Sequence, residues 1–154
     1  MPPYKNWLED TKVRIEKYRK TLTKAEIRKY KLEFLERVAK KVDQFSSKCG
    51  ECFQSQGEIT ALLDNLAVLV QLPTMATKNH HRKINKIVHH LRKQHKLIPA
   101  GTYTAIGNGA GVAVGVAIGV ATGNIGAGIG IGAGLGVGLG TALEAKAKKD
   151  GKII

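Results

Sequence analysis

The amino-acid sequence predicts an all-α protein in two parts: a small water-soluble helical bundle, followed by a transmembrane hairpin of two helices. Three observations support this. Residues 1–96 carry 21 basic against 10 acidic side chains, a net charge of +11, whereas residues 97–143 carry no charged side chain. Glycine is concentrated in the uncharged part, with 14 of the 18 glycines between Gly107 and Gly140. In the charged part, apolar residues recur at helical spacing and no strand pattern is visible.

The charged part, residues 1–98, is predicted to form one basic domain of about four helices. Thr23-Lys-Ala-Glu26 fits a capping box that opens the second helix, and Pro73 and Pro99 follow the third and fourth. The expected helices cover residues 5–20, 23–45, 56–71 and 78–96. Their predicted inward residues are Ile27, Tyr30, Phe34, Val38, Phe45, Ile59, Leu62, Leu63, Leu66, Leu69, Ile84, Ile87, Val88 and Leu91. Cys49-Gly50-Glu51-Cys52 is expected to form a turn.

The uncharged run is predicted to cross a membrane twice. Residues 105–143 are too many for one crossing of about 20 residues, and Thr122-Gly123-Asn124 interrupts them with turn-forming residues. We therefore expect two transmembrane helices, 105–121 and 125–143. Residues 99–104 would be a linker and residues 144–154 a basic tail.

Glycines recur every four residues in both segments, which on a helix makes a groove that a neighbouring helix can approach closely. The predicted helix-packing residues are Gly107, Gly111, Gly115, Gly119, Gly126, Gly128, Gly130, Gly132, Gly134, Gly136, Gly138 and Gly140. Residues 125–140 also alternate glycine with larger residues, which leaves a glycine-rich β assembly of many chains as an alternative. Helix is favoured because lipid forces the backbone to bond to itself.

Three stretches carry a resemblance: Gly-Val-Ala-Val-Gly-Val-Ala-Ile-Gly, then Gly-Asn-Ile-Gly-Ala-Gly-Ile-Gly-Ile-Gly, and a closing Leu-Glu-Ala-Lys. Residues 105–143 resemble the glycine-zipper hairpins of small bacterial membrane proteins. The resemblance implies a two-helix membrane hairpin that self-associates, and it implies no reaction. The repeated glycines are also similar to those of the ATP synthase rotor ring, but Glu144 lies at the end of the run. Ion translocation by that mechanism is therefore not supported.

Charge predicts the orientation of the hairpin. Lys93 and Lys96 precede it and four lysines follow it, whereas the turn has no basic residue. By the positive-inside rule both termini face the cytoplasm, and the expected location is the bacterial inner membrane. The N-terminus lacks the apolar core of a signal peptide, which agrees with a cytosolic first part.

Two cysteines and a histidine cluster predict a zinc site. Cys49 and Cys52, with His90 and His95, supply the two thiolates and two imidazoles of a tetrahedral structural site. On an ideal helix His95 lies near the apolar face and His90 about 120° off it, so the last turn would have to loosen. His89 is the substitute ligand. His80 and His81 lie about 21 Å up the helix from His95 and cannot share its metal. A thiol–disulfide pair, or no chemistry at all, remains an alternative.

No grouping of residues indicates catalysis, so the chain is expected not to be an enzyme, and no small-molecule substrate is inferred. We expect a membrane protein that self-associates into a homo-oligomer, with a zinc-binding cytosolic domain that senses or recruits. The partners would be the lipid bilayer and its anionic headgroups. A pore formed by a ring of hairpins is the first alternative. A membrane-tethered nucleic-acid binder, motivated by the +11 charge, is possible but not favoured.

Overall fold

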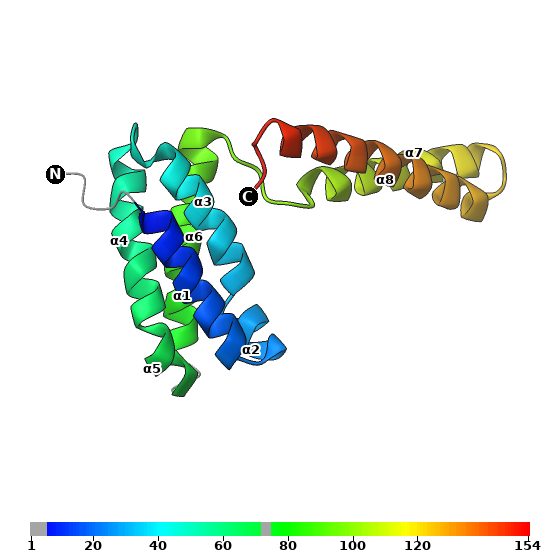
Figure 1. The fold of residues 1–154 in the computed structure, drawn as a ribbon. Helices are drawn as coiled ribbons and strands as arrows, with labels where there is room; N and C mark the ends of the chain where they lie inside the picture. Colours follow the sequence, from blue (N-terminus) through cyan, green and yellow to red (C-terminus); the bar gives the residue numbers. More distant parts are fainter. Residues whose placement is uncertain (1–5, 72–74) are drawn as a thin grey trace. The chain divides into compact units, whose positions relative to one another are not determined.

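The computed structural model describes residues 6–71 and 75–154, and these residues are almost entirely helical. The chain divides into two compact units, Met1–Lys96 and Leu97–Ile154, which we call the helical unit and the hairpin (Figure 1). The helices of the helical unit are α1 (Trp7–Thr21), α2 (Lys24–Lys29), α3 (Leu32–Ser46), α4 (Gly50–Asp64), α5 (Leu66–Gln71) and α6 (Met75–His95). Those of the hairpin are α7 (Thr102–Ala121) and α8 (Ile125–Lys149).

The core of the helical unit lies between its four long helices, α1, α3, α4 and α6, which run alongside one another in Figure 1. Burying one large apolar side chain there contributes about 1.5 to 3 kcal/mol, so this core is the main stabilising feature of the unit. Its largest fully buried side chains are Tyr30, Ile15, Leu32, Leu35, Ile59, Leu63, Leu66, Ile84, Ile87, Leu91 and Val38.

Two predicted helices are interrupted in the structure. The expected helix 23–45 is α2 and α3, because Lys31 adopts a left-handed conformation with φ of 55°. The capping box at Thr23 and Glu26 is confirmed. The expected helix 56–71 begins earlier, at Gly50, and breaks at Asn65. The prediction that Cys49–Cys52 forms a turn was therefore wrong: Cys49 is the N-cap of α4 and Cys52 lies in its first turn.

Tyrosine and tryptophan hydrogen bonds hold the helices of this unit in register. The Trp7 indole donates to Thr60 Oγ1 at 3.1 Å, and the Tyr18 hydroxyl donates to the Leu63 carbonyl at 2.9 Å. The buried Tyr30 donates from its hydroxyl to the Leu69 carbonyl at 3.2 Å. Each of these bonds satisfies a polar group that burial would otherwise penalise, so α1 and the α2–α3 corner are fixed against α4 and α5.

The hairpin packs backbone against backbone. Gly107, Gly111, Gly115 and Gly119 of α7 face the stripe on α8 formed by Gly128, Gly132, Gly136 and Gly140. A Cβ at Gly132 would lie 2.7 Å from the Gly115 Cα and would also meet the Gly111 carbonyl. The glycines are required here because any side chain would force the helices apart. The first set of α8 glycines is therefore its inner stripe. A second, outer stripe, formed by Gly126, Gly130, Gly134 and Gly138, takes no part in this contact. A Cβ at Gly130, Gly134 or Gly138 would meet nothing within 4 Å, and one at Gly126 would meet only the Asn124 side chain, at 3.9 Å.

Both hairpin helices are long and apolar enough to cross a membrane. They are Thr102–Ala121 and Ile125–Lys149. Only 11% of the 18-residue apolar stretch of the first helix and 22% of that of the second are buried. A core helix of a soluble protein would be mostly buried, whereas here large apolar side chains such as Val114, Leu135 and Leu139 are 59%, 65% and 68% exposed. The hairpin thus presents an apolar surface on its outside and glycine on its inside.

The base of the hairpin is held together by main-chain hydrogen bonds. The expected linker 99–104 already contains the start of α7, and the expected tail 144–154 continues α8 to Lys149. Residues 98–100 then bond to residues 152–154 in parallel, through Ile98 N to the Lys152 carbonyl (2.8 Å), Ile154 N to the Ile98 carbonyl (3.0 Å) and Ala100 N to the Ile154 carbonyl (3.1 Å). Neither segment is a free connection.

Glu144 completes this base. It continues the inner stripe of α8, four residues after Gly140, and so its side chain faces the start of α7. Its carboxylate accepts hydrogen bonds from the backbone N–H groups of Gly101 and Thr104. Helix N-termini carry unpaired N–H groups and partial positive charge, so Glu144 acts as the cap that Gly101 lacks.

Candidate metal centre

The first turn of α4 places two thiols on one side of the helix. Cys49 has an extended backbone as N-cap, and Cys52 follows three residues later, a spacing that brings side chains to the same face. Neither cysteine is in a disulfide. Cys52 is fully buried, whereas Cys49 is partly exposed. The site is therefore closed on the Cys52 side and reaches solvent near Cys49.

The end of α6 brings two imidazoles to these thiols. The Nε2 atom of His90 lies 3.3 Å from Cys49 Sγ and 3.5 Å from Cys52 Sγ. The Nε2 atom of His95 lies 3.2 Å from Cys52 Sγ. All four potential ligand atoms lie within 4.8 Å of one another, so Cys49, Cys52, His90 and His95 could hold a metal ion.

These distances fit a tetrahedral ion. With zinc–sulfur bonds of about 2.3 Å and zinc–nitrogen bonds of about 2.0–2.1 Å, sulfur and nitrogen ligands stand about 3.5 Å apart. The three sulfur–nitrogen distances, 3.2 to 3.5 Å, are close to that value. The donor set has room for one small cation at its centre.

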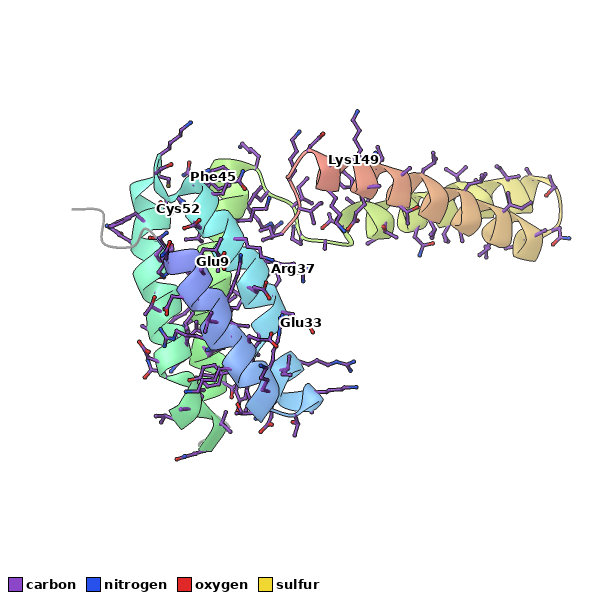
Figure 2. The ribbon with its side chains drawn as sticks, in the orientation of Figure 1. Glu9, Glu33, Arg37, Phe45, Cys52 and Lys149 are labelled. Atoms are coloured by element: carbon purple, nitrogen blue, oxygen red, sulfur yellow. The ribbon has the colours of Figure 1, made fainter. Side chains whose placement is uncertain are left out.

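Two further residues orient the histidines. His90 Nδ1 donates to the Glu51 carboxylate at 2.8 Å, which leaves the lone pair of Nε2 directed at the thiols. Metal-binding histidines commonly use such a carboxylate partner. The ring of Phe45, at the end of α3, stacks on His95 with centroids 4.0 Å apart and an interplanar angle of 14°. Figure 2 shows Phe45 and Cys52 at the same end of the helical unit.

Burial controls the protonation of these groups. It raises the pKa of the Cys52 thiol to about 12, helped by a hydrogen bond with Cys49. It also lowers the pKa of His95, with a smaller contribution from the His90 charge. His95 therefore favours the neutral form that binds metals. The Cys52 thiolate needs a cation beside it to exist at neutral pH.

The geometric objection to pairing His90 with His95 does not apply. The helix α6 remains helical to His95 without loosening, and Lys96 follows it with φ of 55°. Both rings reach the site because each extends its distal Nε2 atom to within 3.5 Å of Cys52 Sγ. His89, the predicted substitute, is exposed and lies outside the cluster.

The remaining histidines lie elsewhere, as expected. His80 is buried and places its Nε2 atom 3.1 Å from the Tyr30 carbonyl, and His81 Nε2 lies 2.7 Å from the Lys29 carbonyl. Burial is the main reason why the pKa of His80 is lowered. These two side chains fix α6 against the α2–α3 corner.

Sequence reasoning missed Glu51 and Phe45. Glu51 is an acidic residue between the two cysteines, which is a usable signal, whereas nothing in the sequence places Phe45 beside His95. In comparisons with known proteins, no family model, no curated protein and no solved structure matches the chain. The functional argument therefore rests on the chain's own residues.

Proposed function

We propose that this chain is a non-enzymatic integral membrane protein. A structural zinc ion holds its helical unit, its hairpin lies in a bilayer and associates with other copies, and the helical unit senses or recruits a partner on the cytoplasmic side. The observation that carries the proposal is the convergence of two thiols and two imidazoles within 4.8 Å at the ends of α4 and α6.

Zinc is the favoured ion because of the donor types. Thiolates and imidazoles in a tetrahedral set of four are typical of structural zinc, while catalytic zinc keeps one position open for water. Zinc would also stabilise the Cys52 thiolate, which burial otherwise disfavours. A domain of this size has a thin core, so an ion joining α4 to α6 would add the stability that its core alone does not supply.

The zinc proposal is tested by metal analysis of the purified full-length chain. We expect about one zinc per chain for the wild type. The variant His90→Gln should lose the metal, and its neighbour His89→Gln, which changes an exposed histidine outside the cluster, should keep it. Wild-type protein without stoichiometric metal, and with folding unchanged by a chelator, would contradict the proposal.

The membrane proposal follows from the surface of the hairpin. Its exposed apolar side chains would each be costly in water, and its glycine-rich helices have low helix propensity there. Lys146, Lys148, Lys149 and Lys152 lie at its base, whereas the turn at residues 122–124 is uncharged. This distribution supports a bacterial inner-membrane location with both termini in the cytoplasm.

Self-association is supported by small residues on the outer faces of the hairpin. The outer glycine stripe of α8 lies two residues, about 200°, from the inner stripe, and a Cβ added at its Gly130, Gly134 or Gly138 would meet nothing within 4 Å. The outer face of α7 carries the same four-residue step. The exposed small residues there are Ala105, Gly109, Ala113, Ala117 and Ala121. A neighbouring copy could thus pack the small residues of its α7 closely against the glycines of this α8.

The test of self-association places large side chains on the outer stripe of α8. The double variant Gly130→Leu, Gly134→Leu keeps the inner contact with α7 but blocks the outer face, so the oligomer mass should fall. Sedimentation equilibrium in density-matched detergent measures this mass. The control, Val116→Leu with Val120→Leu, adds bulk at exposed positions of α7 outside its stripe and should leave the mass unchanged. A wild-type protein that is monomeric at every concentration would refute self-association.

A pore is the second candidate function, favoured by the same outer stripes. An α7-to-α8 contact between copies is heterologous, and such contacts close into rings when their rotation allows. The measurement is ion flux from liposomes at high protein loading. Vesicles that remain tight would exclude the pore and leave the self-associating anchor.

A further inference from the structure

All charged side chains on the exposed face of α6 are basic. The basic residues of this helix and its end are Lys78, Arg82, Lys83, Lys86, Arg92, Lys93 and Lys96, and all seven are exposed. Met75–His95 contains no acidic residue. The neighbouring helix α4 has the opposite composition, with three acidic residues and no basic one.

Most of this charge lies in one stripe opposite the core. At 100° per residue, Lys78, Arg82, Lys86, Arg92 and Lys93 fall within an arc of about 120°. The buried Ile84, Ile87 and Leu91 face the other way. The stripe runs about 22 Å along the helix.

The stripe is scarcely neutralised within the chain. Among the described residues its one ion pair joins Lys86 to Glu58 at 3.2 Å, where both side chains are exposed. Arg82 donates only to the neutral amide oxygen of Asn79. By contrast, the basic residues of α1 are interleaved with acids and form ion pairs with Glu9, Asp64 and Glu36.

The path of the chain brings this stripe to a membrane. Six residues separate His95, the end of α6, from Thr102, the start of α7. Extended, they span at most about 25 Å. If the hairpin lies in a bilayer, His95 is held within that distance of Thr102, and Arg92 and Lys93 lie less than one helical turn further along α6. This short tether gives headgroups a high effective concentration near α6, which a freely diffusing nucleic acid lacks.

We infer that the basic stripe of α6 binds the anionic headgroups of the bilayer that holds the hairpin. The inference rests on the proposed membrane location and names the surface that the helical unit meets there. Among the residues whose side chains the structure describes, none of the exposed large apolar ones lies on α6. The helix therefore adsorbs by charge, without inserting apolar side chains, and its attachment is salt-sensitive.

The experiment reconstitutes the full-length chain in vesicles of neutral phosphatidylcholine, with or without about 30% anionic phosphatidylglycerol. Lysine acylation is then mapped by mass spectrometry, and an alkaline wash confirms that the hairpin has inserted. In anionic vesicles, Lys78, Lys86 and Lys93 should be acylated at least about five-fold more slowly than in neutral vesicles. This factor corresponds to the binding free energy of about one basic residue at an anionic surface. Lys17 and Lys20 of α1 serve as internal references, and about 0.5 M salt should abolish the protection.

Variants assign the effect to the stripe. In the triple variant Lys78→Gln, Arg82→Gln, Lys93→Gln, the remaining Lys86 should lose its protection from acylation in anionic vesicles. The control Lys24→Gln, Arg28→Gln, Lys29→Gln removes the same charge from exposed positions of α2, leaves the reference lysines in place and should keep the protection of Lys86.

Three results would overturn the inference. If the hairpin inserts in both vesicles and the α6 lysines react equally, lipid binding is wrong while the membrane proposal stands. If short duplex DNA protects these lysines and anionic lipid does not, the stripe is a nucleic-acid surface. A chain that inserts in neither vesicle would overturn both the inference and the proposed function.

Discussion

The helical unit and the hairpin are both made of helices, but they arrange their residues in opposite ways. In the helical unit, side chains such as Leu35 and Ile84 are fully buried and charged residues face outward. In the hairpin, most of the buried positions of α7 and α8 are glycines, and large residues such as Leu135 and Leu139 are exposed. The first arrangement suits water, in which apolar burial drives folding. The second suits lipid, in which close backbone contact holds helices together.

The difference shows what a helix requires in each solvent. Glycine in an exposed helix interior costs about 1 kcal/mol relative to alanine in water, so α8 would be a poor helix there. In lipid an unpaired backbone group is far more costly, and helix formation no longer depends on the side chain. Each unit should therefore respond strongly to changes that leave the other almost unaffected.

The largest expected contrast comes from one substitution made in each unit. Leu35→Ala should lower the free energy of unfolding of the helical unit by about 2 to 5 kcal/mol, because it leaves a cavity among fully buried residues. Leu135→Ala removes a side chain that is 65% exposed and should have little effect on the hairpin in detergent. Circular dichroism during detergent or denaturant titration measures both. Similar losses at the two positions would show that Leu135 is packed.

The glycine stripes should give a smaller contrast within α8. Gly132→Ala places a Cβ against the backbone of Gly111 and Gly115, so the hairpin should lose about 1 to 3 kcal/mol by overpacking. The control Gly134→Ala meets nothing within 4 Å and should be neutral or slightly stabilising. The measurement is unfolding of the monomer by SDS in dilute micelles. Equal effects of the two variants would contradict the inner packing.

The metal centre should depend on Glu51 in a graded manner. Glu51→Gln keeps the shape of the side chain but weakens the hydrogen bond that orients His90. Loss of such a partner costs about 10- to 100-fold in metal affinity. Glu58→Gln, which affects only an exposed pair with Lys86, is the control. Competition with a zinc chelator measures affinity, and equal affinities for the two variants would remove Glu51 from the site.

The smallest effect should be a pH dependence from His80. Its pKa in the folded state lies below the usual histidine value of 6.5, chiefly through burial and then through the nearby His81 and Lys83 charges. The unfolded chain therefore binds a proton first as the pH falls, and folding stability is lost as the pH falls below about 6.5. The variant His80→Gln, whose side-chain amide can still donate to the Tyr30 carbonyl, should lose less folding stability than the wild type as the pH falls. Comparing the two at saturating zinc isolates His80, and parallel pH profiles would contradict this assignment.

Periodicity predicted most of the helices because their buried faces are regular. Ile84, Ile87 and Leu91 were placed correctly, whereas the breaks at Lys31 and Asn65 were not, since no glycine or proline marks them. The predicted inward positions Phe34 and Phe45 are only partly buried. Leu32, Leu35 and Val42 are the residues of α3 that are fully buried in their place. The break at Lys31 causes this difference, because it rotates the face that α3 turns toward the core.

The candidate metal cluster was predictable from residue type, because few other arrangements explain two cysteines and a histidine cluster. Its geometry was not, since it depends on which turn of α4 carries Cys52 and on where α6 ends. The two stripes of α8 pose a similar problem. Both repeat every four residues, and the turn at Thr122–Asn124, rather than the repeat, selects the stripe that meets α7. Position along that stripe then explains why Glu144 faces the start of α7.

The pairing of residues 98–100 with residues 152–154 has a mechanical consequence. Tension arriving from α6 reaches Ile98 before it reaches α7, and there three main-chain hydrogen bonds connect it to the end of α8. A pull on the helical unit is therefore shared between both arms of the hairpin instead of unwinding α7 from its first turn. Under such a pull the two helices of the hairpin would move together, because residues 98–100 and 152–154 are bonded to each other at its base.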